Sequence, residues 1–217
     1  MEWDLLSPLD DGERREVLQL ARRRRFKRGE VLFHEGDPGV TLHLVDRGHV
    51  AMRVTTPLGD IATLAVKGPG DYFGELALVG QAGIRNATVV AVDTVETLSV
   101  QRDQFDMLRG KHRNFDEVLV EVLANEVRRM SDLLVEAHFA PVEVRVFRRL
   151  AELARLFANG NGEVVIPLTQ DDVASLAGTT RPSANKVLRA AQDEGILQIS
   201  RGSVEILDRP LLDRKAR

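Results

Sequence analysis

The sequence predicts an α+β protein in which an antiparallel β-domain, a long helix and a small helical domain follow one another. Three observations lead to this prediction. Short apolar runs alternate with turn residues from Val31 to Val100. An apolar heptad pattern then extends over Phe115–Phe139, and two short helical segments flank Gly178. These patterns differ in period, so each indicates its own kind of element.

Length and composition limit the class of protein. The 217 residues are enough for two modest domains, and 43% hydrophobic with 29% charged residues is ordinary for a globular chain. The absence of cysteine excludes disulfides, thiolate-bound iron–sulfur clusters and a cysteine nucleophile, and it fits a reducing cytoplasm. No apolar run approaches the ~20 residues that span a bilayer, and the acidic N-terminus lacks the basic region of a signal peptide. We therefore expect a cytoplasmic protein.

The net charge of −3 is unevenly distributed along the chain. Residues 1–139 carry 18 Lys and Arg against 23 Asp and Glu, whereas residues 140–217 carry 12 against 10. This mild positive balance permits nucleic-acid contact in the C-terminal part but does not establish it.

The N-terminal region is expected to form a short helix before the strands begin. Asp10 or Asp11 is placed to cap a helix over Glu13–Ala21. The basic run Arg22–Arg28 follows it directly. Such a run is typical of a solvated face, and a contact surface for RNA polymerase or DNA is the alternative.

Six short apolar or alternating runs predict the strands of the β-domain. They are Val31–Phe33, Thr41–Val45, Val50–Val54, Ile61–Val66, Ala87–Val92 and Val95–Val100. Turn residues rich in Gly, Pro and Asp separate the runs. Strands at regular spacing of about 8–12 residues with such turns indicate an antiparallel sandwich or barrel.

The stretch Asp71–Thr88 interrupts this series and is longer than a hairpin needs, which is typical of a functional loop. Gly74 lets the backbone approach a ligand closely, and exposed amides beside it can donate to phosphate oxygens. Arg85 offers a planar fork of donors for a phosphate. Glu75 would repel a phosphate unless it accepted hydrogen bonds from ligand hydroxyls, as an acid does from a ribose. The stretch therefore predicts a cradle for one small anion with an attached sugar.

A long helix is predicted over Phe115–Phe139, preceded by Asn114 and terminated by Pro141. Apolar residues recur on it at heptad spacing: Val120, Leu123, Val127, Met130, Leu134 and Ala137. A second stripe on the same helix comprises Leu119, Val122 and Leu133. One seam alone is also typical of a helix in a core. Two stripes favour a helix between its own domain and a partner chain, so we predict a parallel homodimer.

The region after Pro141 predicts helices around a tight turn and then a hairpin. In chain order the segments are residues 142–158, Val164–Pro167, Thr169–Ala177, Gly178–Thr180, Arg181–Glu194, Ile196–Ile199 and Val204–Leu207. A short glycine-containing turn between two helices is the helix-turn-helix signature, and the two-stranded hairpin is interpreted as the wing of a winged helix. Small and apolar residues are predicted to join the two helices: Ala174, Leu176, Ala177, Ala184, Val187, Leu188 and Ala191.

The opposite face of the second helix carries donors suited to a DNA groove. These are Arg181, Asn185, Lys186 and Arg189. Arg and Lys pair with guanine edges, and Asn pairs with adenine. Hydroxyl and amide side chains near the helix starts suit phosphate oxygens: Thr169, Gln170, Thr180 and Ser183. Arg201, at the tip of the wing, is another phosphate candidate.

Two motifs stand in this order, joined by the heptad helix: FGELAL…RNAT and LTQDDVASLAGTTRPSANKVLRAAQDEGIL. The arrangement resembles the cyclic-AMP receptor protein branch of the CRP/FNR family of bacterial transcription regulators, over roughly residues 5–207. The resemblance implies a cyclic-nucleotide-binding, jelly-roll-like β-roll over residues 1–113, a dimerisation helix over 114–140 and a winged helix-turn-helix over 141–217. It also implies a homodimer that binds a palindromic DNA operator under the control of cyclic AMP and contacts RNA polymerase.

The same resemblance implies the residues of the ligand pocket. In the family the acid after the glycine takes the ribose hydroxyl, and the arginine with the next residue takes the cyclic phosphate. Those positions are Gly74, Glu75, Arg85 and Asn86 here. The implied pocket wall comprises Met52, Leu64, Ala65, Phe73, Leu76, Ala77 and Ala87. Met130 and Ser131 lie where the family reads the base, and Arg181, Pro182 and Lys186 match its base-contacting positions.

Three residues depart from the family pattern. Asn86 stands where bacterial cyclic-AMP receptors usually have Ser or Thr, and Asn can still donate to phosphate. Met130 occupies one base-reading position and leaves Ser131 as the main polar candidate. Pro182 stands where a glutamate often accepts from cytosine; proline fits the first turn of a helix but cannot make that contact. The operator is therefore expected to differ at that base pair.

Other interpretations either keep the DNA-binding domain and change the ligand, or assign a different function to the protein. The pocket could take cyclic GMP, another small anion or no ligand, in which case Glu75 and Arg85 would pair with each other to avoid buried unpaired charge. A haem or metal sensor is disfavoured because the five histidines are scattered along the chain. An enzyme is disfavoured because the winged helix accounts for the C-terminal part, which has no nucleophile–base pair or metal-ligand spacing.

Overall fold

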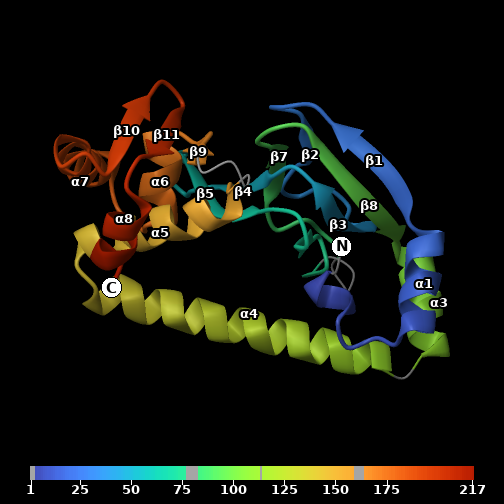
Figure 1. Ribbon diagram of the computed structural model, residues 1–217. Helices are drawn as coiled ribbons and strands as arrows, with labels where there is room; N and C mark the ends of the chain where they lie inside the picture. The colour runs from blue at the N-terminus through green and yellow to red at the C-terminus, as the bar shows by residue number, and fades with distance from the viewer. Residues whose placement is uncertain (1–2, 77–82, 113, 159–163) are drawn as a thin grey trace. The chain divides into compact units, whose positions relative to one another are not determined.

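The computed structural model describes residues 3–76, 83–112, 114–158 and 164–217 (Figure 1). The chain forms two compact units. The first comprises Met1–Val54 and Val66–Met130, and the second comprises Thr55–Ala65 and Ser131–Arg217. Helix α4 (Asn114–Phe139) contributes to both.

The N-terminal domain is built from two four-stranded sheets whose strands pair antiparallel where the pairing is resolved. One sheet has the order β1 (Arg22–Phe26), β8 (Val95–Gln101), β3 (Thr41–Arg47) and β6 (Tyr72–Phe73). The other has the order β2 (Val31–Phe33), β7 (Thr88–Ala91), β4 (Val50–Thr55) and β5 (Ile61–Lys67). This architecture confirms the predicted β-roll.

Two of these strands are absent from the sequence prediction. In β1 the four arginines are all exposed and only Phe26 is buried, so the strand has no apolar alternation to detect. Its backbone nevertheless pairs with β8 from Arg22 opposite Ser99 to Phe26 opposite Val95. The two-residue strand β6 is too short to leave a pattern, and it pairs with β3 through Phe73 opposite His43.

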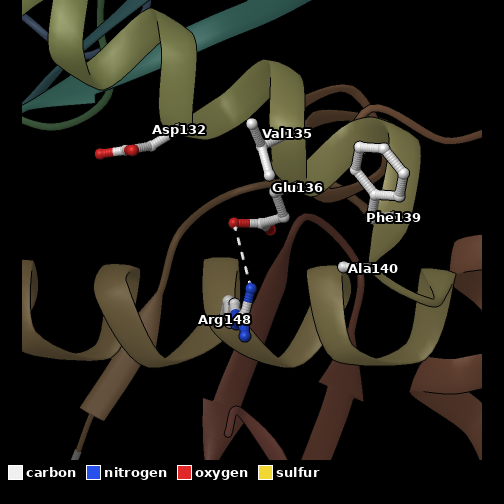
Figure 2. A pocket seen from close by; sticks show the side chains of 6 residues that line it. All are labelled: Asp132, Val135, Glu136, Phe139, Ala140 and Arg148. Carbon is white, nitrogen blue, oxygen red and sulfur yellow. Dashed lines mark ion pairs between the residues drawn. The ribbon is translucent and has the colours of Figure 1, made fainter.

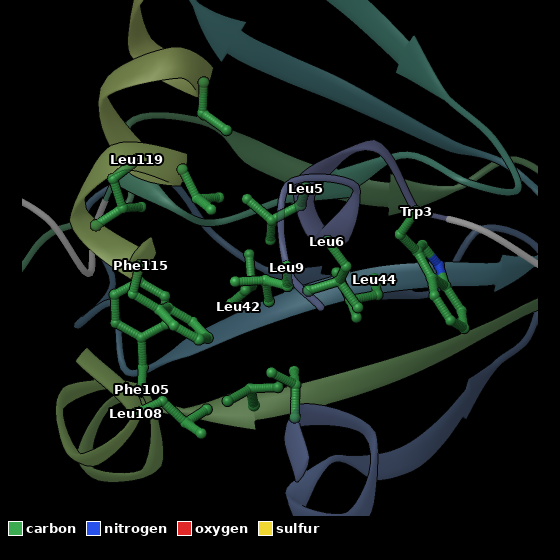
Figure 3. Close-up of a cluster of buried hydrophobic side chains, with 14 residues drawn as sticks. Trp3, Leu5, Leu6, Leu9, Leu42, Leu44, Phe105, Leu108, Phe115 and Leu119 are labelled. Atoms are coloured by element: carbon green, nitrogen blue, oxygen red, sulfur yellow. The ribbon is translucent and has the colours of Figure 1, made fainter. Parts of the chain in front are cut away.

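Two apolar cores hold the first unit together. The smaller core contains Phe26, Val45, Val50, Phe73, Val89, Ala91 and Val95. The larger core joins the N-terminal segment, the adjoining helices and the sheet (Figure 3). In it, Phe115, Leu119 and Val122 of α4 pack with Leu42 and Leu44 of β3. The N-terminal segment is also anchored by a 2.9 Å hydrogen bond from Trp3 Nε1 to the carbonyl oxygen of Val45.

Helices α1 (Asp11–Leu20) and α3 (Arg102–Lys111) flank the larger core. Asp10 caps α1: its side chain accepts from the amides of Gly12 and Glu13 at 2.8 Å. Helix α1 was expected from sequence, and its ends differ from the predicted bounds, Glu13–Ala21, by one or two residues.

Helix α4 has one buried and one exposed apolar stripe. Leu119 and Val122 of the predicted second stripe lie in the larger core, whereas Leu133 is only partly buried. On the heptad seam the side chains of Val120, Val127, Met130 and Leu134 are 59–66% exposed. Leu123 is partly buried and Ala137 is exposed. A single chain therefore leaves most of an apolar seam in solvent.

Within the described residues 142–158 and 164–217, the C-terminal domain has four helices and a three-stranded sheet. The helices are α5 (Val142–Leu156), α6 (Gln170–Leu176), α7 (Arg181–Asp193) and α8 (Arg209–Lys215). The sheet has the order β10 (Leu197–Ser200), β11 (Ser203–Ile206) and β9 (Val164–Ile166). The predicted two-stranded hairpin of the wing is confirmed, because β10 pairs antiparallel with β11. Strand β9 was also predicted, but its pairing with β11, through Ile166 opposite Val204, was not. Helix α8 was not predicted.

The core of this domain orients the helix-turn-helix. Residues from all the packed elements are fully buried, among them Phe147, Leu150, Ile166, Leu188 and Ile196. Ala184 and Ala191 of α7 are also buried, as the small-residue pattern predicted. In the part of the chain that the structure describes, no helix is both long and apolar enough to cross a membrane.

Candidate functional site

Arg85 is the centre of the candidate ligand site, and its backbone is held on both sides. The Arg85 amide donates to the carbonyl of Asp37 at 2.9 Å, and the Gly36 amide donates to the Arg85 carbonyl at 2.9 Å. The side chain points inward and is 3% exposed. Two loops far apart in sequence thus fix where the guanidinium enters the domain.

The guanidinium is bound by the protein itself. Its Nη1 donates to the Gly74 carbonyl at 3.1 Å, and its Nη2 donates to both the carbonyl and the hydroxyl oxygen of Thr41 at 2.7 Å. Its plane lies over the ring of Phe33, 3.9 Å from the centroid. Nε is buried without a hydrogen-bond partner. Burial lowers the pKa of Arg85, and the negative charges of Glu75 and Asp37 oppose this shift.

Gly74 is required by this packing. Its φ of +88° lies in the region that favours glycine. A Cβ there would lie 2.5 Å from Arg85 Nη1 and 2.8 Å from the Thr41 carbonyl oxygen. The glycine therefore serves both the turn and the close approach of the arginine.

Glu75 supplies a second charged side chain next to the arginine, and it is partly buried. Burial raises the pKa of its carboxyl, Glu126 raises it further, and its own backbone amide, Lys67 and Arg85 lower it. Among the described residues no ion pair joins Glu75 to Arg85, so the expected pairing of a ligand-free pocket is not formed. A ligand that carries both hydroxyl groups and an anionic group could complement this acid and this guanidinium, but at the guanidinium it would compete with Gly74 and Thr41.

A histidine that the sequence prediction did not assign to the site lies behind the arginine. His43 is buried and stacks on Phe73, with ring centroids 5.0 Å apart and planes at 2°. Its Nε2 lies 3.1 Å from the Thr41 hydroxyl, and its Nδ1 lies 3.1 Å from the Thr97 hydroxyl. Burial, aided by the charges of Arg85 and Arg24, lowers the pKa of His43 to about 3.

A signal for this group was present in the sequence. Thr41 and His43 are two residues apart in a predicted strand, so they share a face. Nothing local, however, indicates that this face meets Arg85, which is 44 residues away from Thr41.

The other predicted pocket residues are distributed unevenly. Phe73 and Ala87 are buried, Met52 and Ala65 are partly buried, and Leu64, Leu76, Asn86, Met130 and Ser131 are exposed. Ala77 lies outside the described residues. The structure thus brings Phe73, Gly74, Glu75 and Arg85 together, and the roles of the remaining residues stay predictions.

The predicted DNA-reading face of α7 is exposed. Arg181, Pro182, Lys186 and Arg189 are all exposed, and Ala184 and Leu188 are buried on the other side of the helix. Several of the polar side chains already contact each other. Arg189 Nε donates to Asn185 Oδ1 at 3.0 Å, the Thr180 hydroxyl donates to Ser183 at 3.1 Å, and Arg181 lies 3.2 Å from Asp171.

The neighbouring helix and the wing complete this face. Thr169 caps α6, because its hydroxyl accepts from the Asp172 amide at 3.1 Å and donates to the Asp172 carboxylate at 2.7 Å. Its hydroxyl is therefore already engaged, and its phosphate contact stays a prediction. Gln170 is partly buried, and Arg201 is exposed in the turn between β10 and β11. Arg145 Nη1 donates to the carbonyls of Ala177 and Gly178 at 2.9 and 2.8 Å, which fixes the turn between the helices.

A hollow of about 390 Å³ lies between the end of α4 and α5 (Figure 2). Its lining residues are Asp132, Val135, Glu136, Phe139, Ala140 and Arg148. Glu136 pairs with Arg148 at 3.6 Å and with Arg149 at 3.1 Å. None of these residues was predicted to bind a ligand. Elsewhere in the described residues, no group of three or more His, Cys, Asp or Glu side chains could hold a metal ion.

Comparison with known proteins identifies both domains. Residues 23–112 match the profile of the cyclic nucleotide-binding domain, and residues 144–215 match the Crp-like helix-turn-helix domain. A CRP-like cAMP-activated global transcriptional regulator of Mycobacterium tuberculosis is 33% identical over 88% of this chain and 87% of its own length. The chain belongs to the CRP/FNR family of transcription regulators.

Further members of the family are similar over nearly the whole chain. The cyclic AMP receptor protein of Thermus thermophilus is 33% identical, over 97% of both chains. The crystal structure of a catabolite activator protein from the same organism is 32% identical and covers 98% of both chains, with a TM-score of 0.57. This CRP/FNR protein is therefore a DNA-binding transcription regulator with a cyclic nucleotide-binding domain, as the two sequence motifs indicated.

Proposed function

We propose that this CRP/FNR regulator is a homodimer whose binding to a palindromic operator is controlled by cyclic AMP in the β-domain. The observation that supports the ligand is the pair formed by Arg85 and Glu75. Arg85 is buried and Glu75 is partly buried beside Gly74, and no ion pair between them is found in the part of the chain that the structure describes. A cyclic nucleotide offers each its complement: a phosphate for the guanidinium and a ribose hydroxyl for the carboxylate.

The choice of cyclic AMP is supported by the names of two relatives, the cAMP-activated regulator of M. tuberculosis and the cyclic AMP receptor protein of T. thermophilus. In this proposal Asn86, exposed beside Arg85, adds a donor to the phosphate. Ser131 and Met130 face the base.

The homodimer is supported by the exposed seam of α4. Val120, Val127, Met130 and Leu134 recur at heptad spacing, and a second copy of the same seam would remove them from water. Two recognition helices would then read half-sites about one DNA turn apart, ~34 Å. The family relation supports this assembly.

In this function the protein catalyses no reaction and regulates transcription by binding DNA at promoters. The exposed arginines of β1 are the surface offered to RNA polymerase. Arg23 is held by Asp46 and Glu96, whereas Arg22 and Arg24 are both exposed. The ligand shifts the equilibrium between a conformation that binds DNA and one that does not, because it binds the first more tightly than the second.

The deciding experiment measures DNA binding and ligand binding together. DNA from a random-site pool is titrated with the protein in the presence and absence of cyclic AMP and cyclic GMP, and calorimetry gives the nucleotide affinity of wild type and Arg85→Ala. We expect cyclic AMP to strengthen binding to a palindromic subset, and Arg85→Ala to abolish nucleotide binding. Equal nucleotide affinity in the two proteins contradicts the phosphate role of Arg85.

A second candidate keeps the DNA binding and changes the ligand. It is favoured by the occupied donors of Arg85 and by the apolar Met130 at a base-reading position. Under this candidate cyclic GMP, another small anion or no ligand replaces cyclic AMP. DNA binding that is tight without nucleotide and unchanged by either nucleotide would support it.

A further inference from the structure

The contacts of Arg85 raise a question about how it binds a phosphate. A guanidinium can hold two oxygens of a phosphate side by side either with Nη1 and Nη2 or with Nε and Nη2. Both arrangements use Nη2. In this structure Nη2 donates to two oxygens of Thr41 at 2.7 Å, and Nη1 donates to Gly74. A phosphate that binds in either way must therefore compete with Thr41.

Of the two Thr41 oxygens that accept from Nη2, only the hydroxyl can move away from the guanidinium. The carbonyl belongs to strand β3, where Thr41 lies opposite Gln101 of β8, so its position is set by the sheet. The hydroxyl is a side-chain group that can turn away. Releasing Arg85 from the hydroxyl thus needs no change in the backbone.

The hydroxyl of Thr41 is in turn held by His43. Because this oxygen accepts from Arg85, its own hydrogen is free to be donated to His43 Nε2, 3.1 Å away. Nε2 must then be the unprotonated nitrogen, and Nδ1–H donates to Thr97 at 3.1 Å. The result is a directed chain of donors from Arg85 through Thr41 and His43 to Thr97.

Aromatic rings also stabilise the position of the Arg85 guanidinium. Phe33 lies under the guanidinium, and its ring is 5.9 Å from that of Phe73, on which His43 stacks. A cation over an aromatic face is favoured most where water is excluded. The side chain of Arg85 is therefore stabilised in the free protein by the face of a ring as well as by its acceptors.

We propose that Thr41 is a positioning residue which, supported by His43, holds Arg85 in the ligand-free pocket and so weakens the pocket's affinity for a phosphate. The inference rests on the proposed function, because it concerns the phosphate of a cyclic nucleotide. Its consequence is that removing the Thr41 hydroxyl strengthens binding, the opposite of what removing a ligand contact does.

Two variants separate the hydroxyl from the shape of the side chain. Thr41→Val keeps the branched shape and removes the acceptor, whereas Thr41→Ser keeps the hydroxyl. By calorimetry with cyclic AMP we expect Thr41→Val to bind about tenfold more tightly than wild type, as loss of one hydrogen bond to a charged group in the free state would give. Thr41→Ser is expected to restore the affinity of wild type. A Thr41→Val protein that binds no more tightly than wild type overturns the proposal.

A spectroscopic measurement tests the contact without any ligand. In protein with ¹⁵N-labelled Arg and His, we expect hindered rotation of the Arg85 guanidinium, faster rotation in Thr41→Val, and a hydrogen on Nδ1 of His43. Rotation in wild type as fast as that of the exposed Arg201 would overturn the proposal. Failure of the proposed function looks different, since nucleotide affinity would then be unchanged by Arg85→Ala whatever the state of Thr41.

Discussion

Gly74 shows how one residue links backbone geometry to a ligand site. Its positive φ is one constraint, and the 2.5 Å approach of a Cβ to Arg85 Nη1 is another. The two can be separated, because Gly29 has a similar φ of +80° and nothing within 4 Å of its Cβ position. The pair thus distinguishes the cost of the dihedral from the cost of the clash.

We predict that Gly74→Ala lowers the free energy of unfolding by about 2–4 kcal/mol, because strain and clash add, while Gly29→Ala costs about 1–2 kcal/mol. Chemical denaturation of the two variants measures this difference. Gly74→Ala is also expected to lose nucleotide affinity, since Arg85 must move. Equal losses of stability in both variants would show that the contact with Arg85 has no cost.

The carboxyl of Glu75 predicts a pH dependence of ligand binding. Burial raises the pKa of Glu75 in the free protein, with Glu126 adding to the shift and Lys67 and Arg85 opposing it. A ribose hydroxyl donates to the ionised form, so below the raised pKa the ligand must displace a proton. Affinity for cyclic AMP is therefore expected to be full above that pKa and to fall as pH drops through it.

Calorimetry across this pH range tests the dependence, with Glu75→Gln as the matched control. The variant keeps the shape of the side chain and cannot titrate, so its weaker binding should be flat with pH. An identical pH profile in wild type and Glu75→Gln would exclude Glu75 as the group responsible.

At the scale of the element, α7 separates packing from recognition by its two faces. Ala184, Leu188 and Ala191 are completely buried, which fixes the rotation of the helix. Lys186 is then exposed on the groove-facing side. Packing of the apolar face thus sets the direction in which the polar face points. Sequence-specific recognition in a DNA groove requires such a fixed orientation.

We predict that Lys186→Ala loses about 1–3 kcal/mol of DNA-binding free energy at one base position, because a base contact discriminates among bases. Binding to a set of operators with single substitutions measures it. Arg214→Ala, which removes an exposed charge from α8, controls for general loss of positive charge. Uniform weakening over all operators would instead make Lys186 a phosphate contact.

At the scale of the whole molecule, the exposed seam of α4 is the observation on which the proposed homodimer rests. Val127 is 62% exposed in the middle of this seam. In a parallel homodimer its side chain would be buried against its counterpart, and a charge there would be repelled by the same charge in the partner.

Val127→Glu is therefore expected to shift the protein to monomer and to weaken operator binding by more than tenfold. Sedimentation and operator titration provide the two measurements. Arg128→Glu places the same charge one residue away from the seam, and it should leave the dimer intact. Dimers that persist in Val127→Glu would argue that the seam is not the interface.

The order and type of the elements were largely determined by the sequence, because periodicity and caps act locally. The heptad spacing predicted α4 within one residue, Asp10 caps α1 as one of the two predicted candidates, and the turn at Gly178 separates two helices. The motif residues Gly74, Glu75 and Arg85 were also identified in advance, and the structure brings them together.

Only the tertiary structure decided which groups face one another. The arginines of β1 carry no strand pattern, and their strand exists because its backbone pairs with β8. Strand β9 joins the wing although about 40 residues separate it from β11. Nη2 of Arg85 donates to Thr41, and His43 lies behind Thr41. Such contacts join residues far apart in the chain, so no local pattern in the sequence records them.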